Sequence, residues 1–241
     1  MDWLITEDII LRPKTNSISK EFTTHINNNA NHEQIVTTIL QQYPSLTSTT
    51  PTQALDNSPF QHRINMGDAI PVVSHDFRRS LAENKKIAEE KPDGSLRFCI
   101  NYWDLNKVIV KDKFPLPNIT SLHDKLHGST CLSTIDLKSG YYHIPVLPDD
   151  CAKTAFIADG ALYEFLCLLF GVSNGSSSFM RFMTGVLQDL KNVLIYLDNI
   201  IIYSKSPKER YKDLDEVLCH LADYNLKIAP AKCQWFCSKE E

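Results

Sequence analysis

Two short apolar runs late in the chain are separated by a polar pair. The runs cover residues 193–197 and 200–203, and Asp198 and Asn199 lie between them. β-Branched, aliphatic and aromatic residues favour strands, and an Asp-Asn pair tolerates the positive φ angles of a tight two-residue turn. The pattern predicts a β-hairpin that displays the Asp198 carboxylate at its tip. On this pattern alone the tip is either an ordinary turn or a catalytic group.

A second apolar run also contains a single carboxylate. Residues 131–137 are typical of a buried strand, and Asp136 is their one charged residue. Burying an unpaired carboxylate is costly, so such groups normally lie beside a cation, and a pair of them suits a divalent metal ion. We therefore expect Asp136 and Asp198 to be neighbours in the folded chain.

Apolar residues at helical spacing predict helices, and dense apolar runs predict further strands. We expect helices over residues 31–43, 75–90, 119–127, 176–190 and 211–224. Strands are expected over residues 95–102 and 161–169, whereas residues 45–59, rich in Ser, Thr and Pro, are typical of a linker. Strands and helices alternating around an antiparallel hairpin describe an α+β fold.

The composition is typical of a globular protein, and the charged residues are unevenly distributed along the chain. The 241 residues are 43% apolar, enough for a sizeable core, and the formal net charge of −4 argues mildly against a nucleic-acid binder. Positive charge is nevertheless concentrated in one stretch, at Lys85, Lys86, Lys91, Arg97, Lys107, Lys111 and Lys113. This cluster is either a surface for phosphates or a solvated charged face.

The cysteines and the hydropathy pattern bear on location. Seven cysteines without regular spacing fit a reducing compartment, and Cys233 with Cys237 makes a poor zinc site because a second ligand pair at finger-like spacing is missing. We find no apolar run long enough to span a bilayer and no signal peptide at Met1. The expectation is an intracellular protein, cytoplasmic or nuclear, with no membrane partner.

The two carboxylate motifs resemble those of reverse transcriptases. Residues 196–199, Tyr-Leu-Asp-Asn, resemble the Tyr-x-Asp-Asp box, and residues 136–141 resemble the first metal-binding motif. The resemblance is specific to the Pol polyprotein of gypsy-like long-terminal-repeat retrotransposons. It continues, in the same order, through residues 91–97, 106–107, 111–117, 153–156, 163–165, 226 and 232–233.

The resemblance implies an α+β polymerase palm, an antiparallel sheet with helices on one face, together with partial fingers. It divides the chain into a mostly irregular N-terminal extension and linker (1–60), partial fingers (61–130) and a palm (131–241), with primer grip and thumb expected after Glu241. Residues 89–90 run directly into residues 91–94, so a first fingers strand is missing. We therefore expect residues 95–102 to present an unpaired edge.

The resemblance also implies RNA-directed DNA polymerase activity, with two Mg²⁺ or Mn²⁺ ions transferring nucleotides from deoxynucleoside triphosphates (dNTPs) to a primer 3′-hydroxyl. Asp136, Asp198 and the Leu137 carbonyl would hold metal, and the third catalytic carboxylate is replaced by Asn199. Partners would be an RNA or DNA primer–template, dNTPs and other Pol segments. The dNTP-binding residues would be Lys91, Arg97, Tyr141, Phe170 and Gly171, and the nucleic-acid contacts Lys107, Lys111 and Lys113.

Departures from the family pattern leave a second interpretation open. Asn199 removes one negative charge from the catalytic set, and Leu169, Ser176 and Met180 replace the usual Pro, Pro and Gln around the nucleotide pocket. The alternative is a catalytically dead remnant, or a co-opted nucleic-acid-binding palm fragment. An α+β domain unrelated to nucleic acid would need every motif to match by chance.

Overall fold

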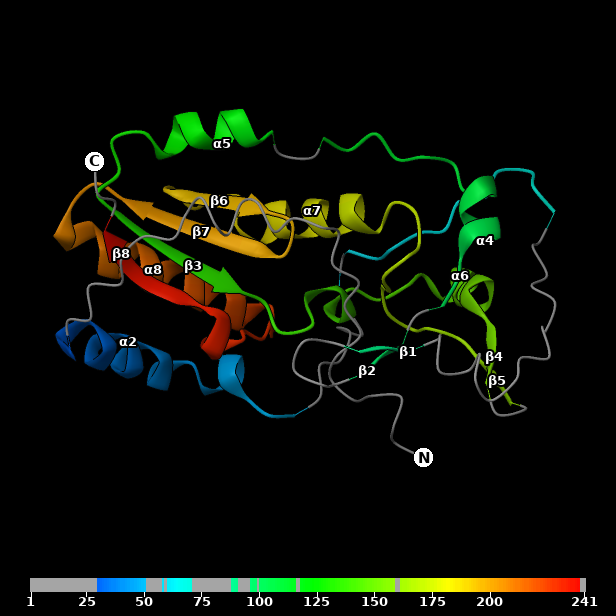
Figure 1. Cartoon of the computed structure of the whole chain (residues 1–241), viewed down its shortest axis with the longest axis horizontal. Coiled ribbons are helices and arrows are strands. Elements are labelled where there is room, and N and C mark those ends of the chain that lie inside the picture. The colour runs from blue at the N-terminus through cyan, green and yellow to red at the C-terminus, as the bar shows by residue number, and fades with distance from the viewer. Residues whose placement is uncertain are drawn as a thin grey trace. The chain divides into compact units, whose positions relative to one another are not determined.

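The computed structural model describes residues 30–50, 58, 60–70, 88–90, 96–98, 100–115, 118–158 and 161–238 (Figure 1). They belong to two compact units. Unit 1 contains the described residues between 51 and 114 and between 141 and 179, and unit 2 those between 30 and 50, between 115 and 140 and from 180 onward. The division into extension, partial fingers and palm stays a prediction.

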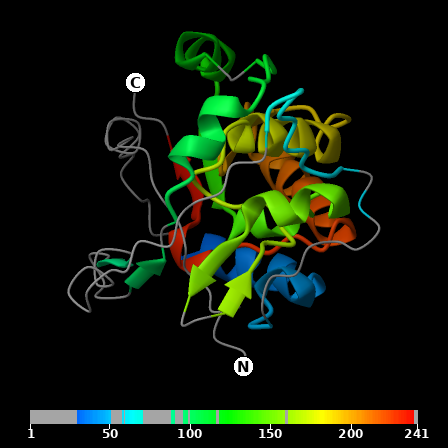
Figure 2. The same ribbon diagram turned by 90° about the vertical axis from the view of Figure 1, so that its right-hand side faces the viewer.

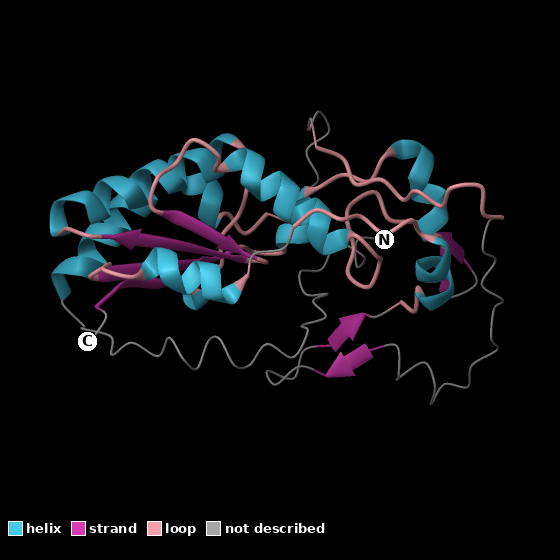
Figure 3. Ribbon diagram, turned by 90° about the horizontal axis from the view of Figure 1, so that it is seen from above, coloured by secondary structure: helices cyan, strands magenta, loops and turns pink. Residues whose placement is uncertain are grey.

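Unit 2 is built on a four-stranded antiparallel sheet (Figures 1 and 3). Its strands follow the order β6 (Val193–Tyr196), β7 (Asn199–Ser204), β3 (Cys131–Asp136) and β8 (Gln234–Ser238). The central pair β3 and β7 runs in continuous register from Cys131 opposite Ser204 to Asp136 opposite Asn199. The predicted strand 131–137 and the predicted hairpin therefore form one sheet.

One face of this sheet is covered by helix α8 (Pro207–Asp223). Ser204 on β7 donates a hydrogen bond of 2.8 Å from its Oγ to Asp213 Oδ2 of α8, and Ile135 and Ile200 on the same face are almost fully buried. The predicted inward residues of α8 are all fully buried, namely Leu214, Val217, Leu218 and Leu221. Helix α7 (Gly175–Val186) reaches α8 through Val186, whose carbonyl accepts from His220 Nδ1 at 3.1 Å.

The opposite face carries a shorter helix, α5 (Ile119–Leu126). Its Leu126 forms a buried cluster with Leu132 and Leu194, against which Ile201 and Tyr203 pack. This cluster lies toward the Leu132 end of β3, and Asp136 lies at the other end of the same face because side chains alternate along a strand. The sheet of unit 2 thus carries α8 on one face and the shorter helix α5 on the other.

The N-terminal segment of unit 2 is more ordered than a linker. Helix α2 (Ala30–Gln42) ends before Tyr43, whose hydroxyl donates to Asp215 Oδ1 at 2.9 Å. The 3-10 helix η2 (Pro44–Thr47) follows, and Leu46 within it is fully buried. The linker predicted from residue 45 therefore does not begin there; residues 51–57 and 59 lie outside the described part.

Unit 1 contains short elements around a separate core. Its helices are α4 (Trp103–Val108), α6 (Pro148–Cys151) and η4 (Ala152–Thr154), together with η3 (Gly140–His143) from Tyr141 onward. Strand β4 (Phe156–Ala158) pairs with β5 (Ala161–Tyr163), as Figure 2 shows. The core joins residues distant in sequence, namely Ile64, Tyr102, Leu105, Ile109, Val146, Cys151, Leu169 and Val172.

Two strand predictions in unit 1 were wrong. The strand expected over 161–169 ends at Tyr163, and the following residues bond to residues 144–146 instead, with Leu168 N donating to Ile144 O at 2.7 Å. The edge expected at 95–102 is paired, because β1 (Ala88–Glu90) forms antiparallel pairs with β2 (Leu96–Phe98). Backbone groups of a strand need partners, and residues 88–90, predicted as the end of a helix, supply them. Residues 75–87 of that expected helix lie outside the described residues.

No helix within the described ranges is long and apolar enough to cross a membrane.

Two further short elements belong to unit 2. One is the 3-10 helix η5 (Pro230–Lys232), and the other is the turn at Gly128, which follows α5 and has a φ of +77°. Glycine adopts this left-handed conformation without steric cost, as expected for the end of a helix.

Substitution of Leu46 tests whether residues 44–50 belong to the fold. Leu46→Ala should lower the free energy of unfolding by about 2–5 kcal/mol, because it leaves a cavity under a fully buried side chain. Thr47→Ala, at the exposed neighbouring position, should change it by less than about 0.5 kcal/mol. Urea unfolding followed by circular dichroism measures both. Equal values for the two variants would mean that the segment is a linker after all.

Candidate active site

The candidate site lies at one end of the central strand pair of unit 2, where the Asp136 motif on β3 meets the Asp198–Asn199 motif before β7. Asp136 is the last residue of β3 and lies opposite Asn199, the first residue of β7. The Asp136 carbonyl accepts a 2.8 Å hydrogen bond from Ala229 N, so the backbone polar groups of Asp136 face away from β7. The Asp136–Asn199 pair is therefore of the non-hydrogen-bonded type, with Cα atoms about 4.5 Å apart and side chains close together on one face.

Asp198 lies in the turn directly before Asn199. Strand β6 ends at Tyr196, which pairs with Asn199, so the two central turn residues are Leu197 and Asp198. Leu197 has a φ of +53°, whereas Asp198 is not among the residues with positive φ. A positive φ at the first central residue only is the pattern of a type II′ turn.

The predicted turn, Asp198 with Asn199, was therefore displaced by one residue. Asp and Asn are the better turn formers, but the pairing of apolar residues sets the register. Leu194 pairs with Ile201 on the face covered by α5, and Ile195 pairs with the buried Ile200. In this register Asn199 belongs to the strand. Leu197 must then adopt a positive φ, which is sterically costly for a residue with a branched side chain.

The Leu137 carbonyl points toward the hairpin side of β3. Leu137 forms an antiparallel bridge with Ile228, and its flanking residues make the two hydrogen bonds of that bridge: Ala229 N to the Asp136 carbonyl, and Lys138 N to the Lys227 carbonyl, each 2.8 Å. The backbone groups of Leu137 itself therefore face the other way. This direction is compatible with the predicted metal ligand at Leu137.

The donor set of this sheet end is two carboxylates and one amide. Nowhere in the described ranges do three or more His, Cys, Asp or Glu side chains form a metal-binding group. Burial raises the pKa of the nearby Cys233 thiol to about 11. Lys232 places a cation near Asp136, with Nζ 4.0 Å from Asp136 Oδ1.

Two of the predicted nucleotide contacts lie together in unit 1. The Tyr141 and Phe170 rings are stacked, with centroids 4.3 Å apart and an angle of 7° between their planes. The Tyr141 hydroxyl lies 3.1 Å from Ser176 Oγ, and the Phe179 ring is 5.0 Å away. A stacked and hydrogen-bonded ring is held in one orientation, as a residue that shapes a binding pocket must be.

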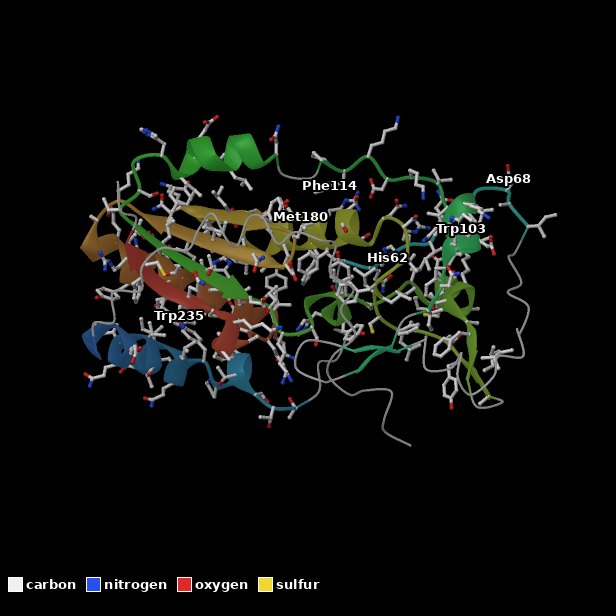
Figure 4. The ribbon with its side chains drawn as sticks, in the orientation of Figure 1. His62, Asp68, Trp103, Phe114, Met180 and Trp235 are labelled. Atoms are coloured by element: carbon white, nitrogen blue, oxygen red, sulfur yellow. The ribbon has the colours of Figure 1, made fainter. Side chains whose placement is uncertain are left out.

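Two of the three predicted nucleic-acid lysines have partners within unit 1. The Lys107 ammonium lies 2.8 Å from Asp104 Oδ1 and 4.1 Å from the ring centroid of Trp103, which Figure 4 labels on α4. Lys111 Nζ donates to the Asn106 carbonyl at 2.9 Å and to Ser173 Oγ at 2.6 Å. Lys113 is exposed, with no hydrogen bond or ion pair to the rest of the described chain.

Sequence reasoning missed the residue that holds the loop after Phe170. Asn106 uses both ends of its amide there: Nδ2 donates to the Gly171 carbonyl, and Oδ1 accepts from Ser173 N, both at 2.7 Å. Gly171 has a φ of +89°, which favours glycine. No local pattern reveals these bonds, because they join residues 65 and 67 positions apart.

The remaining predicted contacts are described only in part. Lys91 lies outside the described residues. The Arg97 backbone pairs with Glu89 in the β1–β2 hairpin, and its side chain is not described. The roles assigned to all these site residues stay predictions.

Comparison with known proteins identifies the relatives of the chain. Residues 89–241 match the family model for reverse transcriptase (RNA-dependent DNA polymerase). The retrovirus-related Pol polyprotein from transposon 297 of Drosophila melanogaster is 37% identical over 160 residues, covering 64% of this chain and 15% of the polyprotein. The transposon Tf2-7 polyprotein of Schizosaccharomyces pombe is 38% identical over 147 residues, covering 60% and 11%. The chain thus spans a small part of each relative.

Solved structures show the same fold. The prototype foamy virus protease-reverse transcriptase (CSH mutant) superposes with a TM-score of 0.76 at 19% identity, covering 95% of this chain and 34% of that one. The foamy viral protease-reverse transcriptase in complex with an RNA/DNA hybrid gives a TM-score of 0.75 at 19% identity, with the same coverage. These likenesses confirm the expected α+β polymerase fold.

A pair of substitutions at Leu197 tests the turn. Leu197→Gly should be more stable than Leu197→Ala by about 1 kcal/mol, because only alanine pays the steric cost of a positive φ. At Ile201, in the middle of β7, the order should reverse, since glycine in a strand is usually the weaker residue by about 0.5–1 kcal/mol. Thermal or urea unfolding gives both differences. An alanine variant at least as stable as the glycine variant at Leu197 would contradict the assigned turn.

Proposed function

Because the chain belongs to the reverse transcriptase (RNA-dependent DNA polymerase) family, we propose that the sheet end carrying Asp136 and Asp198 is the catalytic centre of an RNA-directed DNA polymerase domain. The supporting observation is the strand register that sets Asp136 opposite Asn199, with Asp198 next to it in the hairpin turn. Two carboxylates separated by 62 positions are thereby brought to one end of a rigid sheet. The retrotransposon relatives favour a Pol polyprotein as the source.

The residues present fit a divalent metal ion. Mg²⁺ is usually held by one or two carboxylates, with waters and substrate phosphates completing its shell, and Asp136, Asp198 and the Leu137 carbonyl supply such a set. When bound, two such ions lower the pKa of the primer 3′-hydroxyl and stabilise charge on the triphosphate. Asp136 lies at the end of β3 and Asp198 in a two-residue turn, so regular secondary structure places both backbones, as a precise metal geometry requires.

We propose that the nucleotide is bound by the predicted dNTP-binding residues. Lys91, Arg97, Tyr141, Phe170 and Gly171 would contact the dNTP. In this proposal the Tyr141 ring, stacked on Phe170, contacts the sugar and excludes a 2′-hydroxyl. Arg97 would use its planar guanidinium on phosphate oxygens.

The partner we propose is a primer–template. The foamy viral relatives were solved in complex with an RNA/DNA hybrid and with double-stranded DNA. Lys113 is the best placed of the three predicted lysines to bind a phosphate, because Lys107 and Lys111 are engaged within unit 1. Other segments of a Pol polyprotein are further proposed partners, and the cytoplasm or the nucleus is the proposed compartment.

The alternative function, nucleic-acid binding without catalysis, is favoured by Asn199. At about 4 Å and an effective dielectric near 20, a pair of unit charges is worth roughly 4 kcal/mol before screening. Since about 1.4 kcal/mol is a tenfold change in rate, losing one carboxylate from the set would slow catalysis by orders of magnitude. The residue directly opposite Asp136 thus decides between a polymerase and a binding module.

Restoring the missing charge tests the metal site. Asn199→Asp adds a carboxylate opposite Asp136 without changing side-chain size, so Mn²⁺ should bind at least about tenfold more tightly. Asp198→Asn should abolish binding in both backgrounds. As a control, Asn101→Asp adds the same charge in unit 1 and keeps an oxygen for the 2.9 Å bond from Trp103 N. Calorimetric titration measures the Mn²⁺ affinities. Unchanged affinity in Asn199→Asp would mean that the hairpin tip is an ordinary turn and not part of a metal site.

The lysines give a second test, on nucleic-acid binding. Lys113→Gln should reduce the slope of log affinity against log salt by about 0.9 for a duplex, the loss of one phosphate contact. Lys107→Gln should reduce it less, because Asp104 and Trp103 already engage that ammonium. Fluorescence anisotropy with a labelled primer–template gives the slopes. If neither variant alters the slope, the lysines form a solvated face.

A further inference from the structure

An insertion interrupts the pairing between β3 and the chain that runs beside it. Thr134 pairs with Gln234, and Leu137 forms a bridge with Ile228. Between these two pairs the chain advances by three residues along β3 but by six residues along the segment beside it. The three extra residues equal the length of η5, Pro230–Lys232, which loops out of the ladder at this point.

The insertion brings the end of η5 back to Asp136. Ala229 N donates to the Asp136 carbonyl, and Lys232 N donates to the Ala229 carbonyl, both at 2.8 Å. The Cys233 thiol lies near both carbonyls, with Sγ 3.3 Å from the Ala229 oxygen and 3.9 Å from the Asp136 oxygen. The backbone of Lys232 is thus tied to Asp136 through one intervening residue and fixed on its other side by Cys233.

The Lys232 ammonium is near the Asp136 carboxylate without being bonded to it. Nζ lies 4.0 Å from Oδ1, beyond hydrogen-bond length but close enough for Coulomb attraction. The Asp136 side chain is 17% exposed and that of Lys232 is 49% exposed, so the ammonium can move into solvent. Within the described part of the chain, Lys232 makes no ion pair with any other carboxylate.

The charges at this end of the sheet place a lysine and a divalent ion in competition. Among the residues described at this end of the sheet, Asp136 and Asp198 carry negative charges, Asn199 is neutral, and Lys232 is positive. A divalent ion that binds Asp136 must therefore approach an ammonium that already neutralises part of the site. Repulsion between the two cations is not relieved by a third carboxylate, because the position opposite Asp136 is an amide.

We propose that Lys232 is a resident counter-ion of Asp136 that competes with a divalent metal ion and so sets the metal affinity of the site. The inference rests on the proposed function in one respect, namely that Asp136 and Asp198 together hold the metal. Lys232 leaves the carboxylate when the ion enters and returns when the ion departs. The insertion η5 is the structural device that presents the ammonium.

Removal of the ammonium tests the proposal directly. In the full chain, Lys232→Gln should bind Mn²⁺ about tenfold more tightly than the wild type, as measured by the electron paramagnetic resonance signal of free Mn²⁺. Lys212→Gln is the matched control, because it removes a lysine paired with Glu216 at 3.5 Å on α8. It should leave the affinity unchanged, and Lys232→Arg should keep the affinity near that of the wild type. Unchanged affinity in Lys232→Gln, or no measurable binding in that variant, would overturn the proposal.

Thermal unfolding supplies a readout that a purely structural role of Lys232 would not produce. Without metal, Lys232→Gln should melt at a lower temperature, because Asp136 loses a counter-ion. Added Mn²⁺ should raise the melting temperature of Lys232→Gln more than that of the wild type, since a tighter ligand stabilises the folded state more. An equal rise in both proteins would contradict competition.

Asp198→Asn separates this inference from the proposed function. If Asp198→Asn abolishes Mn²⁺ binding and Lys232→Gln has no effect, the metal site stands and the role of Lys232 is wrong. If Lys232→Gln strengthens binding and Asp198→Asn leaves it intact, Lys232 competes at Asp136 while the two-carboxylate site of the proposed function fails.

Discussion

The pairing of β3 with β7 is the constraint on which the candidate site depends. A slip of one residue would turn Asp136 to the other face of the sheet and separate it from Asn199. The register is held from both faces: Ile135 and Ile200 are buried on the side of α8, and Leu132 packs in the cluster under α5. The core of unit 2 thus fixes the strand register, and Asp136 and Asn199 lie at the end of the pair, beyond these clusters.

The segment beside β3 depends in turn on residues that precede the family match. Ile228, opposite Leu137, donates from its backbone N to the Leu46 carbonyl at 2.9 Å. The buried Lys227 donates from Nζ to Thr50 Oγ1 at 2.6 Å. Residues 44–50 therefore brace the strand-like stretch that leads into η5. Because the match begins at residue 89, this support belongs to unit 2 without being part of the matched region.

Sequence patterns predicted elements whose burial is periodic and failed where distant pairing decides the outcome. The apolar faces of α7 and α8 follow a 3.6-residue repeat, so Phe182 and Leu218 were correctly expected inside. The hairpin turn was misplaced by one residue because cross-strand contacts outweigh the turn preference of Asp198 and Asn199. The partner of Lys111 was missed for the same reason: Ser173 is 62 positions away. Asp136 and Asp198 were paired through chemistry, since two lone carboxylates on strands need a shared cation.

Asn199 and Lys232 act in the same direction on the electrostatics of the sheet end. Each makes the proposed site less negative. With Asp136, Asp198 and Lys232 counted together the charge is −1, so a single divalent ion is still attracted, but less strongly than by a set with a third carboxylate and no ammonium. Two positions on the segments beside Asp136, one at the start of β7 and one at the end of η5, therefore act on the same electrostatic quantity.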